Sequence, residues 1–400
     1  MPKSNRDDRP GHVVALRRMG SDMRGKGDEP STRPAPGTGQ VDAVRQVGSF
    51  VLFAALPALT LVTMLAVGLS DDSLSADFHH EIYPQSEHML SGDNPYPPPD
   101  FDPTVGANYI WPPLVAYVLA PLTLLPLGAA DVVMLAIGLV CIAASLWVVG
   151  LRDWRVYGLV AMWPQIAGEM RVSHLTAPLC LLLALAWRAR DRRLEPGILL
   201  GFSIAAKFFV WPLGIWLASR RRHGAALAAA GIAGVSLLLL LPYVAIDDYA
   251  RSLLQLGRGF DQDSYTLFGL LVQSGASETA GRLTMWACGL VLLAATWRYR
   301  SFTLAIAAAL TLSPIVWLDY FALAAVPLAI ARPRLSWIWF LPLATWGLRG
   351  AGLHIGDPWD IARLLLVFLV VFAVAFRKEP DRARARATRA SVPAPARLPT

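Results

Sequence analysis

The chain has 400 residues, of which 55% are hydrophobic and only 16% are charged. This composition excludes an ordinary soluble domain, in which about a quarter of the residues are charged, and indicates a helical protein with many membrane spans. The net charge of +7 is concentrated in the two tails and in short loops. We therefore interpret it as a topology signal and expect no nucleic-acid partner.

The two ends of the chain are basic. Residues 1–46 are rich in Arg, Gly and Pro, and they are too long and too charged for the start of a signal peptide. Residues 377–400 are rich in Ala, Arg and Pro. We predict that both are disordered tails on the cytoplasmic side of the plasma membrane, flanking a multi-pass domain over residues 47–376.

The first apolar run, at 48–69, leads into an acidic loop at 70–109. Between residues 70 and 112 the chain has eight carboxylates and no Lys or Arg. Loops without basic residues favour the side away from the cytoplasm, so we expect an extracytoplasmic loop. Carboxylates and cations gathered near one membrane face favour acid–base chemistry on a charged substrate.

The next part of the chain contains apolar runs at 110–128, 131–150, 156–168 and 172–188. Arg152 and Arg155 favour the cytoplasmic side, yet two full spans before them would place them outside. We therefore expect one of the first two runs to be broken or re-entrant.

The apolar run at 196–218 is flanked by the basic segments WRARDRRLEPG and RRRH. A single span cannot have both ends in the cytoplasm, so we predict a hairpin of two short helices with Lys207 near its tip. Each half has about 11 residues, roughly 16 Å of helix, which falls short of a ~30 Å crossing. Such short elements are tolerated where they pack against protein or line a cavity.

The remaining apolar runs are predicted spans, and they lie at 224–245, 282–298, 301–314, 316–331, 335–348 and 361–376. The expected fold is an all-α polytopic bundle of about 10–12 membrane segments. The three cysteines lie inside apolar runs and lack the spacing of metal ligands. His79 and His80 with Glu81 could bind a metal, but adjacent side chains point apart in most backbones, so we expect no metal site.

Several short motifs follow one another in a particular order: ADF ending at Phe78, GDNPY at 92–96, WPPL at 111–114, GFSIAAK at 201–207 and SPIVW at 313–317. In this order they resemble the GT-C superfamily of lipid-sugar-dependent glycosyltransferases. The resemblance is closest to glycosyltransferase family 87, the polyprenol-phosphate-mannose-dependent mannosyltransferases, and it extends over about residues 48–376.

Three positions depart from the pattern of that family. Glu81 precedes Tyr83 where the family commonly has a Tyr. The segment GEMRVSHLT, with Glu169 and His174, stands where the family often has Gly-Gln-x-Asn, and Asp319 replaces a His. These departures concern the donor and acceptor more than the reaction class.

The resemblance implies that the protein transfers a sugar, mannose first, from a polyprenyl-phosphate donor to a hydroxyl of a glycolipid or envelope glycan. Transfer is expected at the outer face of the plasma membrane, with inversion, no cofactor and membrane lipids as partners. Asp77 is the expected general base, and Lys207 is the first candidate to contact the phosphate. The other expected substrate-binding residues are Glu81, Tyr83, Tyr96, Trp111, His174, Arg258 and Asp319.

Three other functions agree with the same residues. A transferase of the same fold could use an arabinofuranosyl or another pentose donor. A transporter or flippase for a polar lipid would also contain broken helices and buried charges, although such proteins usually show internal repeats. An assembly protein with a degenerate site is the third alternative, because of the departures at Glu81, His174 and Asp319.

Overall fold

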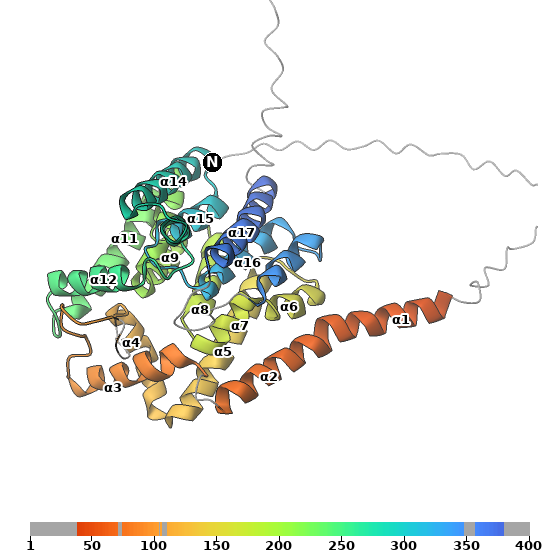
Figure 1. Cartoon of the computed structure of the whole chain (residues 1–400), viewed down its shortest axis with the longest axis horizontal. Coiled ribbons are helices and arrows are strands. Elements are labelled where there is room, and N and C mark those ends of the chain that lie inside the picture. Colours follow the sequence, from red (N-terminus) through yellow and green to blue (C-terminus); the bar gives the residue numbers. More distant parts are fainter. Residues whose placement is uncertain (1–37, 71–73, 104, 106–109, 348–356, 380–400) are drawn as a thin grey trace, which may run out of the picture. The chain divides into compact units, whose positions relative to one another are not determined.

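The computed structural model describes residues 38–70, 74–103, 105, 110–347 and 357–379, and all regular elements in these ranges are helices (Figure 1). Residues 1–37 and 380–400 lie outside the described residues, so most of each predicted tail stays a prediction. Helix α1 begins at Thr38, before the expected domain start at 47, and the last helix ends at Lys378. The last Pro before the first span is Pro36, so no Pro interrupts the helix on that side.

Five helices among the described residues are long and apolar enough to cross a membrane. They are Ala43–Ser70, built from α1 (Thr38–Phe50), η1 (Val51–Ala55) and α2 (Leu56–Ser70), then α5 (Leu127–Val148), α11 with η5 (His223–Leu237, Leu238–Leu240), α14 (Glu278–Tyr299) and α17 (Pro358–Lys378). The expected polytopic helical bundle is therefore confirmed.

Many of the remaining helices are too short for a full crossing. Those in or near the bundle are α4 (Pro113–Leu119), η3 (Ala120–Leu124), α6 (Trp154–Ala161), α7 (Pro164–Val172), α8 (Thr176–Arg188), α9 (Glu195–Ala206), η4 (Phe208–Val210), α10 (Pro212–Ser219), α13 (Leu267–Gln273), α15 (Phe302–Leu312), η6 (Leu318–Ala324), α16 (Ala325–Ala331) and η7 (Trp337–Thr345). The loop after the first span forms η2 (Phe78–Ile82) and α3 (Tyr83–Ser91), and α12 (Ile246–Phe260) follows η5.

The run at 110–128 is not a span, and this settles the topology problem posed by Arg152 and Arg155. Tyr96 Oη donates to the carbonyl of Trp111 at 3.3 Å, and Tyr83 Oη donates to the carbonyl of Leu125 at 2.8 Å. Both ends of α4 and η3 are therefore joined to the loop at 74–103, and α3 packs against both helices (Figure 1). We call this the loop end of the bundle. Between this loop and Arg152 the only full-length span in the described residues is α5, which places that arginine at the opposite end.

The predicted hairpin at 196–218 is confirmed. Helix α9 ends at Ala206, Lys207 adopts an extended conformation, and α10 returns toward the opposite end. Asp191, just before α9, pairs with Arg220, just after α10, at 3.2 Å. The two bases of the hairpin therefore lie together, with Lys207 at the turn between its arms.

A sharp bend separates α7 from α8. Their axes are bent by 117°, and together they have the length and composition of one broken span or of a re-entrant loop. Helix α8 packs against α5 on one side and α9 on the other, and α9 packs closely against α11. The loop-end terminus of α8 and the turn of the hairpin are thereby positioned for the cluster of polar side chains described next.

Candidate active site

Polar and aromatic side chains from five separate segments meet at the loop end. They are Asp77, Glu81, Trp111, Glu169, His174, Lys207, Asp319 and Tyr320, and we call them the loop-end cluster. Their sequence positions are far apart, so the cluster exists only because the short helices turn back within the bundle. Clusters of this kind, with both carboxylates and cations in a partly closed space, are typical of catalytic sites.

His174 lies between two carboxylates. Its Nε2 is 3.4 Å from Asp77 Oδ2, and its Nδ1 is 3.5 Å from Asp319 Oδ2. Thr176 Oγ1 donates to the same oxygen of Asp319 at 2.7 Å, which fixes the orientation of that buried carboxylate. Asp77 keeps 26% of its side chain exposed, whereas Asp319 keeps 4%, so Asp77 is the one that a substrate can reach.

The bend between α7 and α8 determines where His174 lies. Ser173 ends α7 at φ 53°, and Leu175 precedes α8 at φ 64°, so both neighbours of His174 have the left-handed backbone that side chains other than Gly rarely adopt. Glu169 Oε1 accepts from the backbone N–H of Ala177 at 2.8 Å and so satisfies one of the free donors at the start of α8.

A second left-handed serine is joined to this bend. Ser75 has φ 53°, and Ser173 Oγ donates to Ser75 Oγ at 2.8 Å in a fully buried contact. Ser75 is two residues before Asp77, and Ser173 immediately precedes His174. The hydroxyl pair therefore connects the two chain segments that carry the Asp77–His174 contact.

Glu81 is held against the indole of Trp111, whose Nε1 donates to Glu81 Oε2 at 2.9 Å. Burial raises the pKa of Glu81 to about 7, although this hydrogen bond and the charge of Lys207 act in the opposite direction. Burial also raises the pKa of Asp77 to about 6, with further increases from the charges of Glu81 and Asp319 and decreases from His174 and Lys207. Asp77 is thus a stronger base than an exposed aspartate.

Lys207 is buried at the turn of the hairpin. Its Nζ lies 4.8 Å from the ring of Trp111 and 4.1 Å from the ring of Tyr320, close enough for cation–π attraction. In the described part of the chain, no hydrogen-bond acceptor pairs with this ammonium group. An unpaired buried ammonium beside carboxylates can bind an anionic group of a substrate.

Comparison with known proteins identifies the family. The family model of glycosyltransferase family 87 matches residues 109–318, which is more than half of the chain. The chain belongs to glycosyltransferase family 87. No curated protein and no solved structure gave a match.

The family 87 match covers only part of the loop-end cluster. It includes Trp111, Glu169, His174 and Lys207, but it begins after the loop that carries Asp77. It supports glycosyltransferase activity, while the position of Asp77 beside His174 comes from the geometry alone.

Three predicted substrate-binding residues are not members of the loop-end cluster. Tyr96 lies behind it, where its ring packs on Tyr249 and its hydroxyl contacts the backbone of Trp111. Tyr83 donates a hydrogen bond to the backbone at the end of η3 and so links the loop to that helix. The side chain of Arg258 is exposed on α12, and within the described residues no contact joins it to the cluster.

His79 of the first loop pairs with an aspartate. His79 Nδ1 lies 2.7 Å from Asp131 Oδ2 in the first turns of α5, and the His80 ring is beside that of His79. Ser75 Oγ donates to the backbone carbonyl of Asp131 at 3.3 Å. Across the described ranges, no group of three or more His, Cys, Asp or Glu side chains could hold a metal ion.

Sequence reasoning missed several residues of this site. Thr176, Ser75 and Ser173 were not predicted, and Glu169 was noted only as a departure from the family pattern. Glu169 gave no signal in the sequence, because the bend that brings it to Ala177, eight residues later, has no Gly or Pro between 173 and 175.

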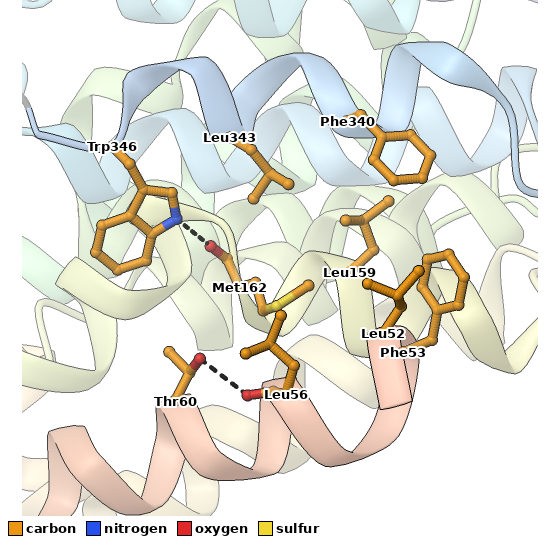
Figure 2. A pocket seen from close by; sticks show the side chains of 9 residues that line it. All are labelled: Leu52, Phe53, Leu56, Thr60, Leu159, Met162, Phe340, Leu343 and Trp346. Atoms are coloured by element: carbon orange, nitrogen blue, oxygen red, sulfur yellow. Dashed lines mark hydrogen bonds between the residues drawn. The ribbon is translucent and has the colours of Figure 1, made fainter. Parts of the chain in front are cut away.

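An apolar groove of about 360 Å³ lies beside the first span (Figure 2). Figure 2 shows Leu52 and Leu56 of the first span facing Leu159 of α6, with Phe340 and Trp346 on the other side. Trp346 Nε1 donates to the carbonyl of Met162 at 2.8 Å and ties η7 to α6. Leu52, Leu56, Phe340 and Trp346 are all exposed, so in a membrane the groove opens to lipid.

Proposed function

We propose that this family 87 protein transfers mannose from a polyprenyl-phosphate donor to a hydroxyl of a glycolipid or envelope glycan at the outer face of the plasma membrane, with inversion. The Asp77–His174–Asp319 arrangement is the observation that carries the proposal. The leaving group is already a phosphate, so the reaction needs a general base more than a strong general acid.

Asp77 is the proposed base. It accepts the proton of the acceptor hydroxyl while that oxygen forms a bond to the anomeric carbon from the face opposite the phosphate. The bond between the anomeric carbon and the phosphate oxygen breaks, and its electron pair leaves with the polyprenyl phosphate. A pKa of about 6 keeps Asp77 mostly ionised at neutral pH and still basic enough to take the proton in the transition state.

Lys207 is the proposed contact for the donor phosphate. Its buried ammonium has no hydrogen-bond partner in the described part of the chain, and charge that develops on the leaving phosphate would be stabilised by it. The rings of Trp111 and Tyr320 both lie against the ammonium, so little reorganisation would be needed when the donor binds. The groove of Figure 2 is the proposed path for the polyprenyl chain.

The test is sugar transfer in membranes that contain the protein, with radiolabelled polyprenyl-phosphate mannose and a mixed envelope glycolipid extract as acceptor. Asp77→Asn should abolish transfer, whereas Asp93→Asn, an exposed carboxylate of the same loop, should leave it near the wild-type rate. Equal transfer by Asp77→Asn and wild type would exclude Asp77 as the base. Transfer only with an arabinose donor would exclude mannose but keep the reaction class.

A further inference from the structure

A cavity of about 380 Å³ lies at the end of the bundle opposite the loop-end cluster. It is formed where α10 ends, α11 begins and α14 ends, and its lining includes Ser219, Arg221, His223, Trp297, Arg298 and Arg300. Helix α10 packs against both α11 and α14, so the cavity is part of the bundle. We call it the basic cavity.

The arginines that line the basic cavity have no carboxylate partner within the described ranges, whereas the arginines next to them in the sequence contact Asp191. Arg220 pairs with Asp191 at 3.2 Å, and Arg222 donates to the backbone carbonyl of the same aspartate at 2.8 Å. Within the described ranges no carboxylate pairs with Arg221, Arg298 or Arg300. A topology signal accounts for positive charge at this end of the bundle. Membrane topology alone does not explain why three guanidinium groups without carboxylate partners in the described ranges line one cavity. This arrangement is suited to binding an anion with more than one negative oxygen.

The surface of helix α14 indicates that the bound anion is the headgroup of a lipid. Its side chains at Leu283, Trp286, Leu290 and Trp297 are 66%, 51%, 58% and 55% exposed, and their spacing of three, four and seven residues places them on one face. Because α14 has the length and composition of a membrane span, this face lies against acyl chains. Trp297 belongs both to this face and to the lining of the basic cavity.

We propose that the basic cavity binds the phosphate headgroup of an anionic phospholipid from the leaflet at that end, with its acyl chains along the exposed face of α14. Guanidinium groups recognise phosphate oxygens by paired hydrogen bonds, and basic pockets between membrane helices are suited to such headgroups. An exposed Trp at the edge of the cavity matches the interfacial depth of the headgroup. The site is separate from the proposed catalytic reaction.

The proposal is tested with the purified full-length protein in neutral detergent, using fluorescently labelled phosphatidylglycerol as the probe and phosphatidylcholine as the reference lipid. The triple variant Arg221→Gln, Arg298→Gln, Arg300→Gln should weaken phosphatidylglycerol binding roughly tenfold or more, because each arginine near a phosphate strengthens binding severalfold. The control Arg188→Gln, Arg193→Gln, Arg334→Gln removes the same charge from exposed arginines outside the cavity and should bind like wild type.

Three results would overturn the proposal. Unchanged binding by the triple variant, or an equal loss in the control, would show that the cavity does not select the lipid. Competition by inorganic phosphate as effective as that by unlabelled phosphatidylglycerol would identify a free-phosphate site instead. If the triple variant aggregates on size-exclusion chromatography, the single exposed change Arg298→Gln replaces it, and its expected loss is severalfold.

Discussion

The position of His174 depends on its two neighbours. Ser173 and Leu175 both have positive φ, and a residue other than Gly in this region costs on the order of 1–3 kcal/mol. Such a conformation persists only where surrounding contacts determine it. The hydroxyl bond between Ser173 and Ser75 is one such contact, and it places a third left-handed residue, Ser75, near Asp77.

This contact gives the first prediction. Ser173→Ala removes the donor to Ser75 and should lower the free energy of unfolding by about 1 kcal/mol. The rate of sugar transfer should fall further, roughly tenfold, because the Asp77–His174 distance is no longer restrained and small displacements of catalytic groups are costly. Thermal unfolding and transfer assays on the same preparation separate the two effects.

Two variants serve as controls for Ser173→Ala. Ser236→Ala removes a hydroxyl that donates to the backbone of its own helix, at Ala233, and it should change neither measurement strongly. Ser173→Gly relieves the left-handed backbone but also loses the bond, so it should stay stable and transfer slowly. Wild-type transfer by Ser173→Gly would show that the hydroxyl pair does not position the site.

The pH dependence of transfer gives the second prediction. With the pKa of Asp77 raised to about 6, the base is protonated at low pH, so the rate should rise with pH and reach half of its plateau near pH 6. Glu81, whose pKa is about 7, is itself mostly protonated at the pH where Asp77 titrates, so Glu81→Gln should leave the midpoint of the rise almost unchanged. The Gln can still accept from Trp111 Nε1, which preserves the contact. A wild-type rate that stays constant around pH 6 would argue against Asp77 as the titrating group.

The sequence pointed to some residues of the candidate site and not to others for a physical reason. Asp77 and Lys207 are charged groups at or near membrane segments, where an ionisable side chain is expensive and therefore noticeable. Ser75 and Ser173 are ordinary small residues whose partnership spans 98 positions, and their role arises from backbone conformation. Arg258 was predicted to bind substrate for the same reason as Lys207, its positive charge near membrane segments. Its side chain is instead exposed on the surface of α12.

Short helices are the elements that build the candidate active site. Basic residues on both flanks of 196–218 predicted the hairpin correctly, because each basic flank independently favours the cytoplasmic side of the membrane. The bend between α7 and α8 could not be predicted in the same way, since residues 173–175 include no Gly or Pro. The re-entrant helices at 113–124 were predicted only as one of two options, and the tyrosine contacts of the loop decide between them.

The contact between α9 and α11 gives the third prediction. A Cβ atom at Gly197 would lie 2.0 Å from the carbonyl oxygen of Ala225, so α9 can approach α11 this closely only with Gly at this position. Gly197→Ala should destabilise the protein by about 1–3 kcal/mol through overpacking, and it should also displace Lys207 at the end of α9. The measurement is the thermal unfolding midpoint in detergent together with the transfer rate.

Gly231→Ala is the matched control for this change. It lies on α11, and a Cβ there would meet nothing within 4 Å. Because Ala favours a helix over Gly by roughly 1 kcal/mol in water, this variant should be neutral or slightly more stable. If Gly197→Ala also leaves the midpoint unchanged, the close approach of α9 to α11 is not required.

At the scale of the whole molecule, the two ends of the bundle carry different charged side chains. The loop end collects the carboxylates, the histidine and the hairpin turn, and the opposite end collects exposed arginines and the basic cavity. Composition and charge predicted a polytopic helical protein because lipid imposes apolar length on every full crossing. They could not predict which runs cross, because a run buried in protein can be equally apolar at half the length.

The last prediction tests this division with cysteine labelling in a protein whose Cys141, Cys180 and Cys288 are first replaced by Ala. Single cysteines are introduced at the exposed positions Asp93, Ala129 and Arg193, and intact cells are treated with a membrane-impermeant maleimide. Asp93→Cys and Ala129→Cys should react, because both ends of the 113–124 segment lie at the loop end, whereas Arg193→Cys should react only after permeabilisation. Opposite accessibility of Asp93→Cys and Ala129→Cys would mean that residues 113–124 cross the membrane. Labelling of Arg193→Cys alone would instead place the loop end, and with it the proposed site of sugar transfer, in the cytoplasm.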